Sequence, residues 1–376
     1  MKVEVSKNAL LRLMQRCQGV ATKKGTMPAL ANAFLVADGD QLTASATDLF
    51  LSVTGSIDAE VKDGGAVALP ARDVFERVRH MPDGPVSIST VGATTTIKAG
   101  GLARRYKVHG IPGDDFPALP APPEGAQAMD LPVGALLWLM QRTAFSISGD
   151  ETRAHLNSAL LEADGDTLRM VSTDGHRLSK AERTVEGLGR EATMLIPLKA
   201  VHELKRLLEE VPAARRDEET VTVTQGGHCA FFAINDVDFS VKLVDAQFPP
   251  YEAVIPEMSA DPVRIHRDQL ESAIKAVSVA ASDKTGGVKL ALSDGALRIE
   301  AETPDGSSFD EVPVDYNGPE FAVGFSAKYI LDVLAAIKDD DEVTLGLSGE
   351  LDPAVVRPAN GKGGDEYIAV IMPMRI

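Results

Sequence analysis

The chain has 376 residues, of which 44% are hydrophobic and 25% charged, so a mainly disordered protein is excluded. At roughly 100–200 residues per domain, this length favours two to four domains. No apolar run is as long as the about 18 consecutive residues that a transmembrane helix needs, and the N-terminus lacks the pattern of a secretory signal. Cys17 and Cys229 lie far apart without metal-ligand spacing, which favours a reduced, cytoplasmic setting. The net charge of −17 argues against a surface that is basic throughout.

The sequence repeats itself three times. The helical pattern of Asn8–Arg16 recurs at Gly134–Arg142, 126 residues later, and more faintly at Asp268–Ala276. Its apolar residues keep the i, i+3/i+4, i+7 spacing of an amphipathic helix. Each copy continues with β-rich runs joined by an Asp-Gly turn, which is typical of hairpins. These turns lie at 38–39, 164–165 and 294–295.

A second helical pattern begins in each copy, at Pro70, Pro197 and Ser326, and each copy closes with an extended stretch marked by proline. We therefore predict three domains, with boundaries at 1–125, 126–256 and 257–376. The connections are short, which favours antiparallel strands. The predicted fold class is α+β, with antiparallel sheets and two helices per domain gathered on one face.

Charge is distributed unevenly between helices and sheets. The six predicted helical windows contain 14 Lys and Arg against 8 Asp and Glu, so they carry +6 and the remainder carries −23. These windows are 6–18, 70–80, 132–144, 197–210, 266–277 and 326–338. One interpretation is that charged residues simply cover solvated helix faces. The alternative, which we favour, is a concave helix-lined surface facing duplex nucleic acid, because phosphates attract Lys and Arg without a reading of base sequence.

The sequence contains no motif that predicts catalysis. Gly361-Lys362 is followed by glycine, so it is no P-loop. Ser172, Asp174 and His176 alternate along a predicted strand, and consecutive strand residues cannot supply the geometry of a triad. We predict that the chain is not an enzyme and needs no cofactor or metal.

Two segments stand out as candidate binding elements. Thr173–Leu178 occupies the repeat position of Thr47–Phe50 but has gained Gly-His-Arg, and a simple turn is the alternative interpretation. Val370–Ile376 is apolar to its end, with two methionines that flank a proline. Methionine is common on adaptable peptide-binding surfaces, although a final core strand also explains this segment.

These features resemble those of the bacterial β sliding clamp, the processivity subunit of DNA polymerase III. The resemblance rests on the three-fold repeat, on Ser172–Leu178, on Lys242–Asp245 followed by Phe248-Pro249, and on Met372–Arg375, and it covers the whole chain. It implies a head-to-tail homodimeric ring with helices around duplex DNA and sheets outside, opened by a clamp loader. A clamp-like hub that gathers peptides without encircling DNA is the alternative.

The resemblance also implies three sets of site residues. A pocket between the second and third domains would bind peptides of the polymerase III catalytic subunit, clamp loader, ligase, and repair and translesion polymerases. It would be lined by Leu156, Thr173, Gly175, His176, Arg177, Leu178, Pro249, Val254, Tyr329, Val370, Met372, Pro373, Met374 and Arg375. The DNA contacts would be Lys24, Arg153, His155 and Lys199. The dimer interface would join Arg104, Arg105, Tyr106 and Val108 to Val279, Ala280, Asp310 and Glu311 of the partner subunit.

Overall fold

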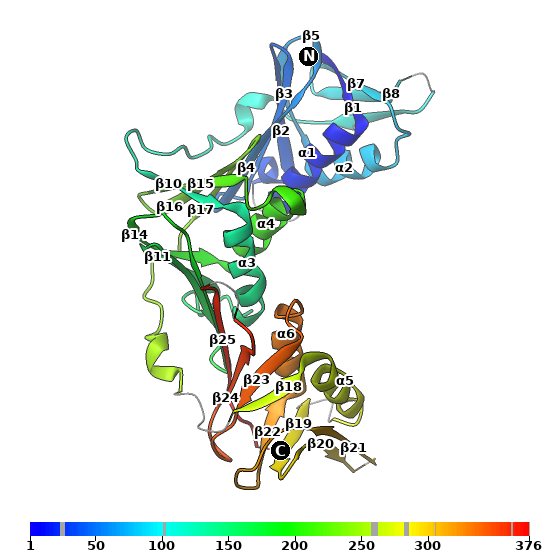
Figure 1. The fold of residues 1–376 in the computed structure, drawn as a ribbon. Helices are drawn as coiled ribbons and strands as arrows, with labels where there is room; N and C mark the ends of the chain where they lie inside the picture. The colour runs from blue at the N-terminus through cyan, green and yellow to red at the C-terminus, as the bar shows by residue number, and fades with distance from the viewer. Residues whose placement is uncertain are drawn as a thin grey trace. The chain divides into compact units, whose positions relative to one another are not determined.

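The computed structural model describes residues 1–22, 27–100, 103–256, 262–281, 286–304, 306–361 and 364–375. Within these ranges the chain forms two compact units, residues 1–133 with 202–243 and residues 134–201 with 244–376 (Figure 1). No helix among the described residues is long and apolar enough to cross a bilayer.

Each of the six predicted helical windows contains an α-helix. The first begins after Ser6, whose hydroxyl caps it by accepting a hydrogen bond from the Ala9 amide at 3.2 Å. It buries Leu10, Leu13 and Met14 on one face, as the apolar spacing predicts. The described helices are α1 (Lys7–Val20), α2 (Ala71–Arg79), α3 (Val133–Thr143), α4 (Leu198–Glu209), α5 (Arg267–Ser278) and α6 (Ala327–Ala336).

Each repeat contributes strands to two antiparallel sheets, so the predicted fold class is confirmed. The first strand set runs across the repeat as β1 (Lys2–Ser6), β7 (Pro85–Val91), β8 (Thr94–Ala99) and β9 (Arg105–His109), with β5 (Glu60–Asp63) beside β1. Its equivalents are β10 (Ala128–Pro132), β15 (Thr220–Gly226), β16 (Cys229–Ile234) and β17 (Val237–Lys242) in the second repeat. In the third they are β18 (Val263–His266), β23 (Glu342–Gly346), β24 (Ala354–Pro358) and β25 (Glu366–Ile371).

The second strand set follows the same plan. In the first repeat it is β4 (Leu51–Asp58), β3 (Gln41–Thr47), β2 (Asn32–Asp38) and β6 (Gly65–Pro70). In the second repeat it is β13 (Arg177–Thr184), β12 (Thr167–Thr173), β11 (Ser158–Gly165) and β14 (Arg190–Pro197). In the third it is β21 (Gly306–Pro313), β20 (Ala296–Thr303), β19 (Gly287–Ser293) and β22 (Phe321–Ser326).

The predicted Asp-Gly hairpin turns are confirmed. Gly39, Gly165 and Gly295 have φ values of +59°, +58° and +71°, in the left-handed region that glycine enters without steric cost. They join β2 to β3, β11 to β12 and β19 to β20.

Successive repeats are joined by two antiparallel strand pairs, which we call seams. At the first seam β4 pairs with β17, with Leu51 opposite Val241, and an eight-stranded sheet results. At the second seam β13 pairs with β25, with Arg177 opposite Ile371, and a second eight-stranded sheet results. The remaining strands of these two types, β9 and β21, are sheet edges. The candidate binding loop Thr173–Arg177 therefore lies at the start of the second seam.

Candidate functional site

The loop between β12 and β13 is held in one shape by its own side chains. The Thr173 hydroxyl donates to the carbonyl of Arg177 at 2.7 Å. The Asp174 carboxylate accepts from the amides of His176 and Arg177 at 2.9 and 3.0 Å. Gly175 has a φ of +91°, which explains why glycine stands there. The gained Gly-His-Arg is thus part of a tight turn that fixes the direction of Arg177.

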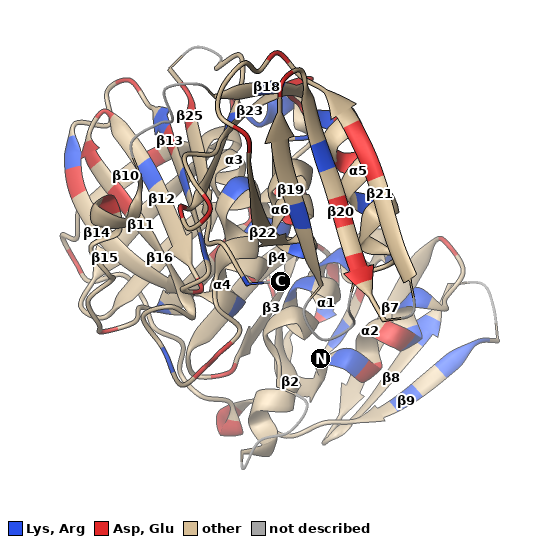
Figure 2. Cartoon of the chain, turned by 90° about the horizontal axis from the view of Figure 1, so that it is seen from below, with Lys and Arg blue, Asp and Glu red and all other residues tan. Residues whose placement is uncertain are grey.

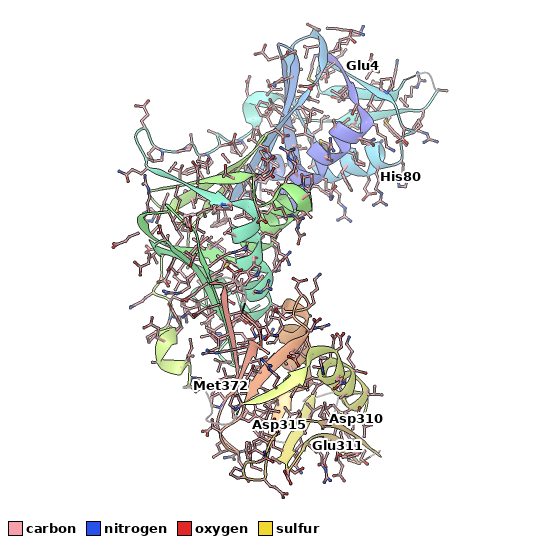
Figure 3. All side chains as sticks on the ribbon, viewed as in Figure 1. Glu4, His80, Asp310, Glu311, Asp315 and Met372 are labelled. Atoms are coloured by element: carbon pink, nitrogen blue, oxygen red, sulfur yellow. The ribbon has the colours of Figure 1, made fainter. Side chains whose placement is uncertain are left out.

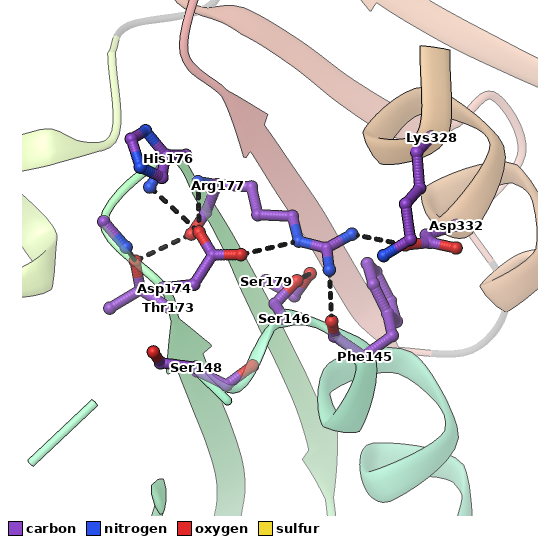
Figure 4. A network of polar contacts seen from close by, with 12 residues as sticks. Phe145, Ser146, Ser148, Thr173, Asp174, His176, Arg177, Ser179, Lys328 and Asp332 are labelled. Carbon is purple, nitrogen blue, oxygen red and sulfur yellow. Dashed lines mark hydrogen bonds and ion pairs between the residues drawn. The ribbon is translucent and has the colours of Figure 1, made fainter. Parts of the chain in front are cut away.

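Arg177 is buried, with 6% of its side chain exposed, and it ties three elements together (Figure 4). Its Nε donates to Asp174 Oδ2 at 3.1 Å, its Nη1 to Asp332 Oδ2 on α6 at 2.6 Å, and its Nη2 to the carbonyl of Phe145 at 2.6 Å. The guanidinium also lies over the Tyr329 ring, 4.4 Å from its centroid. Sequence reasoning found Arg177 and Tyr329 but missed Phe145 and Asp332, whose positions carry no motif.

Burial, together with the nearby Asp174 carboxylate, raises the pKa of the Tyr329 phenol, so the ring stays neutral at physiological pH. The ring therefore offers its π face to the guanidinium and an uncharged hydroxyl to any ligand.

The end of the chain runs beside this loop. Leu178 on β13 is opposite Val370 on β25, and both side chains are buried. Beyond β25, the Met372 amide donates to the carbonyl of His176 at 2.8 Å, and the Met374 amide donates to Gly324 at 2.8 Å. The Met372 side chain remains 44% exposed (Figure 3). The terminal segment is therefore a core strand followed by an exposed methionine that borders the loop.

A buried apolar cluster lies behind the loop. It consists of Leu160, Val171, Leu178, Leu195, Phe248, Tyr251, Val355, Ile368 and Val370. Pro249 is half-buried next to it, and Val254 is 55% exposed at the end of a short 3-10 helix. The second unit thus contains every residue predicted for the peptide pocket. Leu156, Leu178 and Val370 are buried, whereas Gly175, His176 and Arg375 are exposed.

A polar cluster fixes the segment that follows Pro249. The Tyr251 hydroxyl donates to Glu162 at 3.0 Å, and Arg169 donates to the same hydroxyl at 3.2 Å. Burial and the adjacent Glu162 carboxylate raise the pKa of Tyr251 to about 12, so the hydroxyl keeps its proton. Sequence reasoning missed this cluster.

The residues predicted to contact DNA fall on different elements. Lys24 lies outside the described residues. Arg153 and His155 lie in the loop before β11, and Lys199 is exposed in the first turn of α4. Arg153 pairs with Asp150 at 2.8 Å, and one of its guanidinium nitrogens lies 3.9 Å from the point where a Cβ on Gly175 would stand. Arg153 therefore borders the Thr173–Arg177 loop.

The residues predicted for the dimer interface lie on or beside the two unpaired edges. Arg105, Tyr106 and Val108 belong to β9, and Arg104 precedes it and donates to the His80 carbonyl. Asp310 and Glu311 belong to β21, and Glu311 pairs with Arg298 at 2.9 Å. Figure 2 shows Lys and Arg on β9 and Asp and Glu on β21, where Figure 3 labels Asp310 and Glu311. The last two interface residues, Val279 and Ala280, follow α5, where Val279 is 86% exposed.

Phe309 is an exposed aromatic residue on the edge strand β21 that sequence reasoning missed. It is 61% exposed on this strand, which among the described strands pairs with β20 on one side only. The signal in the sequence is an aromatic residue between Ser308 and Asp310, on a strand whose other residues are mainly polar.

The Ser172, Asp174 and His176 side chains do not act on one another. The Ser172 hydroxyl is buried and donates to the Thr143 carbonyl at 2.5 Å. The Asp174 carboxylate binds backbone amides and Arg177, while His176 is exposed. Within the described ranges, no three His, Cys, Asp or Glu side chains cluster in a way that would hold a metal ion.

Three family models match the chain in order: the N-terminal, central and C-terminal domains of the DNA polymerase III beta subunit, over residues 1–120, 130–250 and 252–375. The Beta sliding clamp of Pseudomonas aeruginosa is 33% identical, and that of Escherichia coli K12 is 30% identical, each over 100% of both chains.

Solved structures agree with these matches. The DnaN sliding clamp of Pseudomonas aeruginosa bound to griselimycin has a TM-score of 0.91 at 32% identity and 100% coverage of both chains. The DNA polymerase III beta subunit of Thermotoga maritima has a TM-score of 0.91 at 28% identity, with 100% of this chain and 99% of that chain covered. The chain belongs to the β sliding clamp family, the beta subunit of DNA polymerase III.

Proposed function

We propose that two copies of this chain close head to tail into a ring around duplex DNA and tether the replicative polymerase to it, without catalysing a reaction. The observation that carries the proposal is the seam pattern. Strands β4 and β13 each pair with a strand of the next repeat, β17 and β25. Their equivalents β21 and β9 have no such partner within the described chain. A second copy supplies it, because β21 of one subunit can pair with β9 of the next until the ring closes.

The two edges are complementary in charge. Arg105 and Lys107 lie on β9, next to Arg104, whereas Asp310 and Glu311 lie on β21. Opposite charges across strands favour the pairing of β9 with β21, whereas like charges disfavour the pairing of β9 with β9. The exposed Phe309 adds apolar area to this edge, which a lone subunit leaves in water.

Sedimentation tests the proposed pairing of β9 with β21 of a second subunit. Reversal of charge in the Arg104→Glu, Arg105→Glu variant is expected to shift the protein toward monomer, and the additional changes Asp310→Lys and Glu311→Lys are expected to restore the dimer. Arg215→Glu is the matched control, because Arg215 is 64% exposed outside both edges. A dimer unchanged by the first variant would show that these arginines are not at the interface.

Encirclement is tested on DNA. After loading, a ring is retained on nicked circular duplex but runs off once the duplex is linearised, whereas a hub that only binds peptides is retained on neither. Equal retention on both forms would contradict enclosure. The phosphate contacts we propose are Lys24, Arg153, His155 and Lys199, and loss of one cation is expected to reduce the salt dependence of DNA binding without changing sequence preference.

We propose that partner proteins bind through short extended peptides at the Thr173–Arg177 loop, Tyr329 and Met372. Buried apolar side chains behind a polar rim suit the aliphatic and aromatic side chains of such a peptide. Arg177→Ala, or removal of Met374–Ile376, is expected to weaken binding of a polymerase peptide and to leave the dimer intact. Unchanged peptide affinity in both variants would show that the peptide binds elsewhere.

A further inference from the structure

The loop Thr47–Leu51 at the first seam has the same backbone structure as the peptide loop at the second seam. The Thr47 hydroxyl donates to the Leu51 carbonyl at 2.8 Å. The Asp48 carboxylate accepts from the amides of Phe50 and Leu51 at 2.9 and 2.7 Å. The Lys242 amide donates to the Phe50 carbonyl at 2.7 Å, as the amide of Met372 does to that of His176. Each of these four hydrogen bonds has its counterpart in the peptide loop.

The side chains on these two loops differ, so the first loop exposes apolar side chains where the second loop has glycine and histidine. Leu49 stands where the second seam has Gly175, and it keeps the left-handed backbone with a φ of +75°. A leucine in this conformation is strained, whereas the glycine is not. Leu49 is 55% exposed and Phe50 is 64% exposed. The second loop leaves room beside Gly175, while the first loop projects two apolar side chains.

More than half of each of these two residues is exposed in the isolated chain. Exposed apolar side chains leave their area in water, and the strained backbone of Leu49 raises the energy of the folded state. Only two residues other than glycine among the described residues have positive φ values, Leu49 and Asn235. Asparagine tolerates that region, but leucine rarely does. An exposed apolar pair, in which Leu49 has a strained backbone, points to contact with another molecule.

The charge of Lys242, beside Leu49 and Phe50, indicates the chemistry of the surface that would bind this pair. The Lys242 ammonium lies 5.8 Å from the centroid of the Phe50 ring, and it forms no ion pair among the residues that the structure describes. The Asp48 carboxylate is turned toward backbone amides. A phosphate would interact favourably with Lys242 but would gain nothing from Leu49 and Phe50. An apolar pocket with a carboxylate at its rim complements all three.

We propose that Leu49, Phe50 and Lys242 form a second docking surface, which inserts into an acid-rimmed apolar pocket on the polymerase catalytic subunit. The proposal rests on the proposed function, because two side chains are too small a contact to hold a partner alone. A polymerase already held by its peptide is present at a high effective concentration, so a small second contact then adds measurably to affinity. The surface thus extends peptide binding into a two-point attachment.

The test compares the whole polymerase catalytic subunit with its isolated clamp-binding peptide as probes in surface plasmon resonance. The Leu49→Gly, Phe50→Ser variant is expected to bind the whole subunit about tenfold more weakly than the unchanged protein does. Its affinity for the isolated peptide is expected to be unchanged. Val91→Ser is the matched control, since Val91 is 83% exposed elsewhere in the first repeat. Leu49→Gly alone removes strain, so its melting temperature must not fall.

Whole-subunit affinity within twofold of the unchanged protein would overturn the proposal, as would weaker retention on circular DNA with polymerase affinity intact. Failure of the proposed function is distinguishable, because the unchanged protein would then not bind the peptide at all, and Arg177→Ala would change nothing.

Discussion

Arg177→Met is the sharpest test of how the candidate site is built. Methionine keeps the length and apolar stem of the side chain but removes all three hydrogen bonds of the guanidinium. The two carboxylates it leaves, on Asp174 and Asp332, are 15% and 31% exposed, so water reaches them partly. Asp332 also keeps Lys328 at 3.5 Å. The loss therefore falls at the lower end of the range for breaking a buried ion pair, about 3 kcal/mol.

That loss has a measurable thermal signature. In a unit of about 200 residues, about 3 kcal/mol lowers the melting temperature by roughly 6–12 °C, measured by calorimetry. Arg153→Met is the matched control, because Arg153 is 45% exposed and pairs only locally with Asp150, so it is expected to cost under about 1 kcal/mol. A shift for Arg177→Met no larger than that of the control would refute the view that Arg177 ties the second and third repeats together.

Three further changes test other parts of the structure. Arg16→Met removes two ion pairs of 2.8 Å between the first and second repeats, with Glu210 and Asp236, and is expected to lower the free energy of unfolding in urea by about 1–3 kcal/mol; an unchanged free energy would contradict a role for these pairs in joining the repeats. Burial raises the pKa of Cys17 to about 12, so iodoacetamide at pH 8 is expected to modify Cys229 first, as mass spectrometry would show. Although burial opposes it, a hydrogen bond from Lys180 helps to lower the pKa of Glu182. The ionised Glu182 therefore stabilises the fold fully above about pH 5, and this contribution is lost as the pH falls. In the Glu182→Gln variant, the free energy of unfolding is expected to fall less between about pH 5 and 3 than in the unchanged protein.

The sequence predicted the elements that depend on local pattern. The helices follow from apolar spacing, and the copy of Asn8–Arg16 at Gly134–Arg142 fixed their repetition. The Asp-Gly hairpins follow from the conformational freedom of glycine. These features need only neighbouring residues, so a single sequence contains enough information to place them.

The seams could not be predicted in the same way. Leu51 pairs with Val241, which lies 190 positions later in the sequence, and nothing local in either strand selects the other. The burial of Arg177 was equally hidden, because arginine is mostly exposed and its three acceptors come from separate parts of the sequence. Such contacts are set by packing between repeats, which the alternation of one strand does not record.

The two equivalent loops show which departures from local rules are informative. Gly175 is explained by its backbone, because glycine adopts a φ of +91° without steric cost. Leu49 has no such explanation, because the same turn would be less strained with glycine and the residue is 55% exposed. A residue with a strained backbone and an exposed apolar side chain does not stabilise the folded chain. Either such a residue contacts another molecule, or it has no role in binding. The Leu49→Gly variant separates these cases. If Leu49 has no role in binding, the variant binds the polymerase with unchanged affinity; if Leu49 contacts the polymerase, the variant binds it more weakly although its fold is more stable.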